Sequence, residues 1–143
     1  MTGVPDPETL KTFNNNVADE FRANGGKVGG QFAGAPLLLL TTIGAKSGAQ
    51  HTSPVVYTTD GDRLVVIASY AGGPRNPAWF HNLVANPEVT VEVPGETFPA
   101  RAVVASGEDR DRLYAAQAAK LPVFNEYQQK TTRAIPVVTL ERM

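Results

Sequence analysis

The stretch LLLLTTIGAKSGAQHTSPVVY, from Leu37 to Tyr57, decides the fold because it places a short turn between two apolar runs. Its opening leucines are too few for a core helix, and β-branched residues follow them directly, which favours a pleated backbone. Gly44 and Gly48 give the turn backbone freedom and allow close approach. The stretch therefore predicts a strand, a turn and a second strand.

The turn itself has two interpretations. Lys46, Ser47 and His51 supply one charged and two polar side chains, so the turn could hold an anion. It lacks the residue order of a nucleotide-binding phosphate loop, and no helix follows it. The simpler interpretation is an ordinary hairpin turn with a solvated lysine.

Length and composition indicate one globular domain. The chain has 143 residues, of which 42% are hydrophobic and 19% are charged, which is enough apolar material for one core. The formal net charge of −1 gives no polybasic surface, so we expect no nucleic-acid partner. Cysteine is absent, which excludes disulfides, thiolate metal sites and a cysteine nucleophile. The N-terminus has no signal-peptide pattern, and no apolar run is long enough to span a membrane, so we expect a cytoplasmic protein.

The rest of the chain predicts further helices and strands. Asn76 is expected to cap the second helix, and Ser106 with Asp109 resembles a capping box for the third. Helices are expected from Pro7 to the stop at Asn24, over Ala78–Asn86, from Ser106 to Lys120 and over Phe124–Lys130, and strands at Arg63–Ala68, Glu88–Val93, Thr97–Ala105 and Ile135–Glu141. We predict an α+β fold, a mostly antiparallel six-stranded β-barrel with helices packed outside. Residues 1–143 form one domain, with the first helix and a Gly-rich loop in 1–34 and the barrel in 35–143.

The first helix carries an apolar stripe that something must cover. Leu10, Phe13, Val17 and Phe21 recur at helical spacing. The sheet is the expected partner. The stripe could instead roof a pocket or dock on a lipid surface, which would place the protein at the inner face of the cell membrane.

The residue pattern alone gives no catalytic constellation. His51 and His81 are the only histidines, too few for a three-histidine metal site, and no GxSxG motif presents a serine nucleophile, so we expect no metal. Trp79, the only tryptophan, is either a core residue or a surface for a planar ligand.

Three motifs, kept in order along the chain, carry a family resemblance. They are GAKSGAQHTSP at Gly44 to Pro54, ASYAGGPRNPAWFHNLVANPEVTVEV at Ala68 to Val93, and FNEYQQKTTRAIPVV at Phe124 to Val138. They resemble the actinobacterial deazaflavin-dependent nitroreductase family, whose members use coenzyme F420. The resemblance implies a split β-barrel and a reductase that passes hydride from reduced F420 to a quinone, a nitro compound or an activated alkene. The alternatives are an FMN-dependent split-barrel oxidoreductase and a non-enzymatic carrier of deazaflavin or a lipid-like ligand.

The resemblance also implies where the cofactor would bind. The anionic tail of F420 would meet Ala45, Lys46 and Ser47, and its ring would lie beside Ala78, Trp79, Phe80, His81 and Asn82. Between them the cofactor would run along His51, Thr52, Ser53, Pro54, Val55 and Val56, and along Ile67, Ala68, Ser69 and Tyr70. Family members often carry a basic residue in place of Ala45, arginine in place of His51 and lysine in place of Tyr70. Lys27 or Arg75 could compensate for these losses.

The acceptor side follows from the same resemblance. Val56, Leu121, Phe124 and Tyr127 would line the acceptor pocket. Hydride delivery builds negative charge on an acceptor oxygen, so the Tyr127 hydroxyl, with Ser69 as the next candidate, would donate a hydrogen bond there. Tyr127 could equally be only an aromatic wall. A quinone is favoured over a nitroimidazole because Val56 and Leu121 replace tyrosines found in some relatives.

Overall fold

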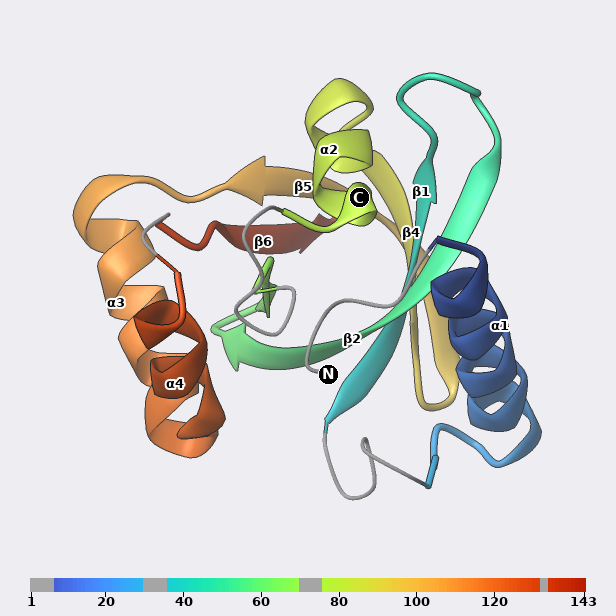
Figure 1. Cartoon of the computed structure of the whole chain (residues 1–143), viewed down its shortest axis with the longest axis horizontal. Helices are drawn as coiled ribbons and strands as arrows, with labels where there is room; N and C mark the ends of the chain where they lie inside the picture. The colour runs from blue at the N-terminus through green and yellow to red at the C-terminus, as the bar shows by residue number, and fades with distance from the viewer. Residues whose placement is uncertain (1–6, 30–35, 70–75, 132–133) are drawn as a thin grey trace.

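A closed barrel organises the chain, whose computed structural model describes residues 7–29, 36–69, 76–131 and 134–143. Within these ranges six antiparallel strands are ordered β1-β2-β3-β6-β5-β4, and β1 pairs with β4 to close the barrel (Figure 1). The predicted antiparallel barrel is thereby confirmed. The strands are β1 (Leu37–Ile43), β2 (Gln50–Asp60), β3 (Arg63–Ile67), β4 (Glu88–Val93), β5 (Glu96–Val104) and β6 (Val137–Arg142), and the helices are α1 (Pro7–Ala23), α2 (Ala78–Ala85), α3 (Gly107–Lys120) and α4 (Val123–Gln129).

The leucine run of β1 is buried on both faces. Leu38 and Leu40 join the cluster that fills the barrel, while Leu37 and Leu39 join a second cluster under α1. Side chains alternate between the two faces of a strand, so a continuous apolar run is what a strand covered on both sides requires. This explains why the run does not alternate with polar residues.

Helix α1 covers the outer face of β1, as predicted for its apolar stripe. Val17 and Phe21 are buried against Leu37 and Leu39, whereas Phe13 remains 37% exposed. The side chain of Leu10 lies outside the described residues. No helix in the described ranges is long and apolar enough to cross a bilayer.

The other helices cover two further parts of the barrel. Helix α2 packs on β1 and β5, and its Leu83 belongs to the cluster inside the barrel. Helices α3 and α4 cover β3 and β6 from outside, where Phe124 packs with Ile67 and Val137. In Figure 1 they lie on the side of the barrel opposite to α1.

Both predicted helix caps are wrong in detail. Pro77 rather than Asn76 occupies the N-cap position of α2, and it makes no side-chain cap. Ser106 is the N-cap residue of α3, but its hydroxyl makes no capping hydrogen bond. Asp109 instead accepts a hydrogen bond from Arg112 at 2.8 Å, so no reciprocal capping box forms.

An ion-pair cluster joins the β2–β3 turn to α3. Asp60 accepts hydrogen bonds from Arg112 at 3.2 and 3.3 Å, and it also pairs with Arg63. The hydrogen bond from Arg112, followed by that from Arg63, lowers the pKa of Asp60 from its ordinary value of 3.8 to about 2. The carboxylate therefore stays charged down to about pH 2.

We expect Asp60→Asn to lower the urea midpoint at pH 7. A carboxyl whose pKa is lowered by folding stabilises the protein above its unfolded-state pKa, and the effect is lost as the pH falls through its folded-state value. The difference between variant and wild type should therefore be full above about pH 4 and should vanish near pH 2. Asp62→Asn is the control, because Asp62 has no ion-pair partner in the described part of the chain. Equal midpoints for Asp60→Asn and wild type at pH 7 would contradict the expectation.

Candidate cofactor and acceptor site

The β1–β2 turn is a tight loop that depends on its glycines. A side-chain Cβ at Gly44 would lie 2.5 Å from Ser47 Oγ and 3.1 Å from His51 Nε2, so a larger residue does not fit without movement. Gly48 has φ +72°, a backbone conformation that favours glycine. The loop is closed by hydrogen bonds from Gly44 N to Ala49 O at 2.7 Å and from Gly48 N to Gly44 O at 3.0 Å.

The same turn presents free hydrogen-bond donors. The backbone N–H groups of Lys46 and Ser47 have no partner among the described residues, and the Lys46 side chain is exposed. Ser47 Oγ accepts a hydrogen bond from Ala49 N at 3.2 Å. Two unpaired N–H groups and an ammonium group at one turn suit an anion. The anion-binding interpretation of the turn thus has geometric support.

Helix α2 holds this turn through two asparagines. Ala45 N donates to Asn82 Oδ1 at 3.0 Å, and Asn82 Nδ2 donates to Thr42 Oγ1 at 3.1 Å. One helical turn later, Asn86 Nδ2 donates to the Ile43 carbonyl at 3.4 Å. Asn82 is only 8% exposed. The amide of Asn82, predicted as a cofactor contact, is thus used within the protein to fix the turn against α2.

The ring-side residues predicted on α2 differ in exposure. Ala78 and His81 are exposed, whereas Trp79 and Phe80 are partly buried and pack against the barrel cluster. The Phe80 and His81 rings meet edge to face, with centroids 5.9 Å apart. Trp79 therefore contacts the core and still keeps an accessible part of its side chain.

The residues predicted along the cofactor differ in exposure. His51 is exposed, and Thr52, Ser53, Pro54, Val56 and Ser69 are partly buried. Val55, Ile67 and Ala68 are buried, so only their backbone could meet a ligand without rearrangement. Tyr70 and Arg75 lie outside the described residues. Gly26 lies beside Pro94 in the β4–β5 turn, which places neighbouring Lys27 at the opposite end of β1 from the anion-binding turn.

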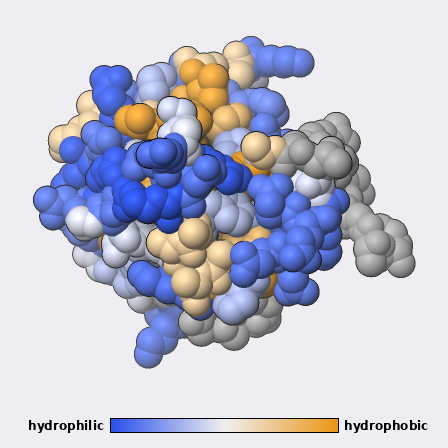
Figure 2. All heavy atoms as spheres, turned by 90° about the vertical axis from the view of Figure 1, so that its left-hand side faces the viewer, coloured by the Kyte–Doolittle hydropathy of each residue, from blue (hydrophilic) through white to orange (hydrophobic). Residues whose placement is uncertain are grey.

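The four residues predicted to bind the acceptor come together. Phe124 is buried in the cluster under α3 and α4, and Val56, Leu121 and Tyr127 pack against that cluster while partly exposed. The Phe124 and Tyr127 rings meet edge to face, 5.3 Å apart. Figure 2 shows the face that carries α3 and α4 as mostly hydrophilic, with hydrophobic residues in small groups. We refer to Val56, Leu121, Phe124 and Tyr127 as the acceptor cluster.

The Tyr127 hydroxyl is suited to donate a hydrogen bond. It has no hydrogen-bond partner in the described part of the chain. Desolvation, and to a lesser degree the charge of Glu126, raise the pKa of Tyr127 above its ordinary value of 10.0. The phenol therefore keeps its proton at neutral pH.

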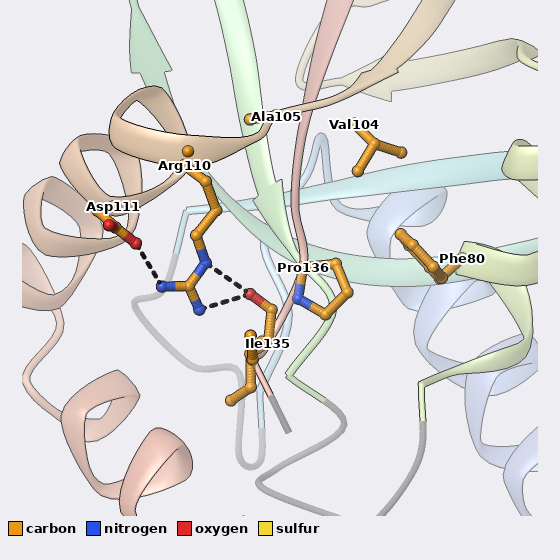
Figure 3. Close-up of a pocket in the computed structure, with 9 residues that line it drawn as sticks. Phe80, Val104, Ala105, Arg110, Asp111, Ile135 and Pro136 are labelled. Carbon is orange, nitrogen blue, oxygen red and sulfur yellow. Dashed lines mark hydrogen bonds and ion pairs between the residues drawn. The ribbon is translucent and has the colours of Figure 1, made fainter. Parts of the chain in front are cut away.

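A pocket of about 410 Å³ lies between α2, the start of α3 and residues 134–136, and it was not predicted from the sequence (Figure 3). Phe80, Val104 and Pro136 line it. Arg110 donates to the Ile135 carbonyl at 3.1 and 2.7 Å and to Gln128 Oε1 at 2.9 Å. Arg110 thus fastens α3 to α4 and to the segment before β6. In the described ranges no three carboxylate or histidine side chains are grouped to hold a metal.

Comparison with known proteins identifies the family. Residues 14–142 match the family model described as F420H(2)-dependent quinone reductase. The F420H(2)-dependent quinone reductase Rv1261c of Mycobacterium tuberculosis is 39% identical over 126 residues, which cover 85% of each chain.

Solved structures agree with the sequence matches. A structure described as F420-H2 dependent reductase (FDR-A) is 36% identical, with a TM-score of 0.69 over 74% of this chain and 94% of that chain. A second, described as a domain-swapped dimer, is 31% identical, with a TM-score of 0.71 over 89% of this chain and 96% of that chain. The predicted split-barrel fold and family resemblance are therefore confirmed, and the chain belongs to the F420H2-dependent quinone reductase family.

Proposed function

We propose that this protein is an oxidoreductase that transfers a hydride from reduced coenzyme F420 to a quinone. The observation that carries the proposal is the β1–β2 turn. Its Lys46 and Ser47 N–H groups have no partner among the described residues, and its Ala45 N–H is bonded to Asn82 of α2. Family membership favours F420 over FMN as the cofactor. We further propose that the acceptor is a small molecule and that the protein is cytoplasmic. A contact between α1 and the inner face of the membrane is compatible with this location.

The turn and α2 fit the two ends of such a cofactor. The Lys46 ammonium and the N–H groups of Lys46 and Ser47 would bind the anionic tail. Trp79 and Phe80, which keep accessible surface while packed on the barrel, would orient the ring. When bound, reduced F420 supplies the hydride. The protein contributes mainly orientation and exclusion of water.

The acceptor cluster would hold the quinone. Val56, Leu121 and Phe124 provide apolar surface, and the Tyr127 hydroxyl provides a donor. Reduction of a quinone to a hydroquinone takes one hydride and one proton, and negative charge builds on a carbonyl oxygen as the hydride arrives. The Tyr127 O–H would donate a hydrogen bond to that oxygen, and the proton would come from Tyr127, Ser69 or solvent.

The direct test is anaerobic mixing of reduced F420 with a short-chain quinone such as menadione. The rate at which oxidised F420 absorbance appears should be proportional to the protein concentration, above the rate without protein. Binding of F420 without turnover of a quinone or a nitroaromatic would favour a carrier. Binding of FMN in place of F420 would favour the FMN-dependent alternative.

Removal of the Lys46 charge should weaken F420 binding. A charge-assisted contact at an exposed site is worth about 1 kcal/mol, so we expect Lys46→Ala to raise the F420 Kd about fivefold at low salt. The difference should shrink at high salt because exposed charges are screened. A fluorescence titration with oxidised F420 at low and at high salt measures the Kd of the variant and of wild type under both conditions. An unchanged Kd at low salt would refute the tail assignment.

A charge added next to Lys46 should act in the opposite direction. The Ala45 N–H is bonded to Asn82, but the residue is exposed, so its side chain can be extended. We expect Ala45→Arg to tighten F420 binding by a similar factor. If the same titration shows no gain, this position does not face the tail.

Loss of the Tyr127 hydroxyl should slow turnover while F420 binding stays intact. Tyr127→Phe keeps the aromatic wall and removes only the donor. A hydrogen bond that strengthens in the transition state predicts a decrease in kcat on the order of tenfold or more. Steady-state rates with a quinone and a nitroaromatic, together with the F420 Kd, show whether Tyr127 acts as a hydrogen-bond donor or only as an aromatic wall. Wild-type rates with both acceptors would leave Tyr127 as a wall only.

A further inference from the structure

A buried amide nitrogen with no hydrogen-bond partner among the described residues lies next to the acceptor cluster. Gln117, on α3, has no exposed surface. Its Oε1 accepts a hydrogen bond from Thr58 Oγ1 at 3.3 Å. Its Nε2 is the buried side-chain nitrogen that has no hydrogen-bond partner in the described part of the chain. An unpaired buried donor destabilises the folded state, so a position serving packing alone would be better filled by an apolar side chain.

The neighbours of Gln117 connect it to the acceptor cluster. Leu121 follows Gln117 by one helical turn, and its N–H donates to the Gln117 carbonyl at 2.8 Å. Thr58 lies two residues from Val56 on the same face of β2. Both Leu121 and Val56 belong to the acceptor cluster. The Gln117 amide is therefore next to this cluster on its α3 side, and Tyr127 is a member of the cluster that α4 supplies.

We propose that Gln117 Nε2 donates a hydrogen bond to an oxygen of the bound acceptor. The proposal rests on the proposed function and adds a second donor to the one from Tyr127. A quinone carbonyl is an uncharged acceptor that becomes anionic as hydride arrives, so a fixed amide N–H in a dry site stabilises the charge as it develops. Thr58 keeps the amide oriented by holding its oxygen.

The acceptor can reach Gln117 only if the cover over it moves. Gln117 has no exposed surface, and Tyr114 on α3 holds α4 by donating its hydroxyl to the Phe124 carbonyl. Binding would therefore require a movement of the elements that are packed around Gln117. The competing explanation is a buried water on Nε2, which would leave catalysis unaffected by the loss of the amide.

Gln117→Met tests the proposal because it keeps the length of the side chain and removes the amide. We expect kcat with menadione to fall about tenfold or more. The F420 Kd should stay within twofold, and the melting temperature of the apo protein should be equal or higher. Gln129→Met, at an exposed position on α4, is the matched control and should behave as wild type. If Gln117→Met does not fold, Thr58→Val/Gln117→Met removes both polar groups together and takes its place.

A spectroscopic measurement tests the contact without turnover. Difference infrared spectra of carbonyl-labelled menadione bound to the protein without cofactor should show a lowered carbonyl frequency in wild type and Gln129→Met, but not in Gln117→Met. Equal frequencies and equal kcat in wild type and Gln117→Met would overturn the inference. If wild type does not oxidise reduced F420, the proposed function fails. The infrared band then decides separately whether Gln117 binds the quinone. A lowered carbonyl frequency in wild type and Gln129→Met, but not in Gln117→Met, supports the contact. An unshifted band in wild type, or an equal shift in Gln117→Met, refutes it.

Discussion

The packing of β1 sets the position of the elements around it, because its leucines are buried on both faces. Leu38 and Leu40 fill the barrel, and Leu37 and Leu39 anchor α1. The strand also pairs with β2 on one side and with β4 on the other, which closes the barrel. Large buried side chains tolerate little displacement in a close-packed core. The position of the C-terminal end of β1, where the β1–β2 turn begins, is consequently fixed by the packing of the core.

Helix α2 is attached to that end of β1 and to the turn that follows it. Asn82 and Asn86 attach the end of β1 and the following turn to the helix that carries Trp79 and Phe80. The donors proposed for the anionic tail and the aromatic residues proposed for the ring are therefore joined by side-chain hydrogen bonds, which would lower the ordering cost of binding. The acceptor cluster lies further along β2, where Val56 touches the clusters under both α1 and α4.

The strands were predictable because their signals are local. Alternation, β-branched residues and glycine-containing turns place β3, β4, β5 and β6 within two residues of their observed bounds, whereas β2 continues to Asp60, three residues beyond the predicted end at Tyr57. The capping box at α3 was mispredicted because the Asp109 carboxylate accepts a hydrogen bond from Arg112, a contact that the local pattern does not show. The contacts of Asn82, Arg110 and Gln117 join residues far apart in sequence, and no local pattern marks them. The tail and acceptor residues came from motif resemblance, since composition and spacing do not encode which side chains meet in space.

In the proposed function, the β1–β2 turn binds the anionic tail of F420 through the backbone N–H groups of Lys46 and Ser47. Amide-resolved NMR of the labelled protein, with and without oxidised F420, tests it most directly. We expect oxidised F420 to cause large chemical-shift changes and slowed hydrogen exchange at the amides of Lys46 and Ser47. A smaller change is expected at Ala45, whose N–H is already bonded to Asn82. Unchanged Lys46 and Ser47 amides at saturating F420, with the changes confined to other segments, would contradict it.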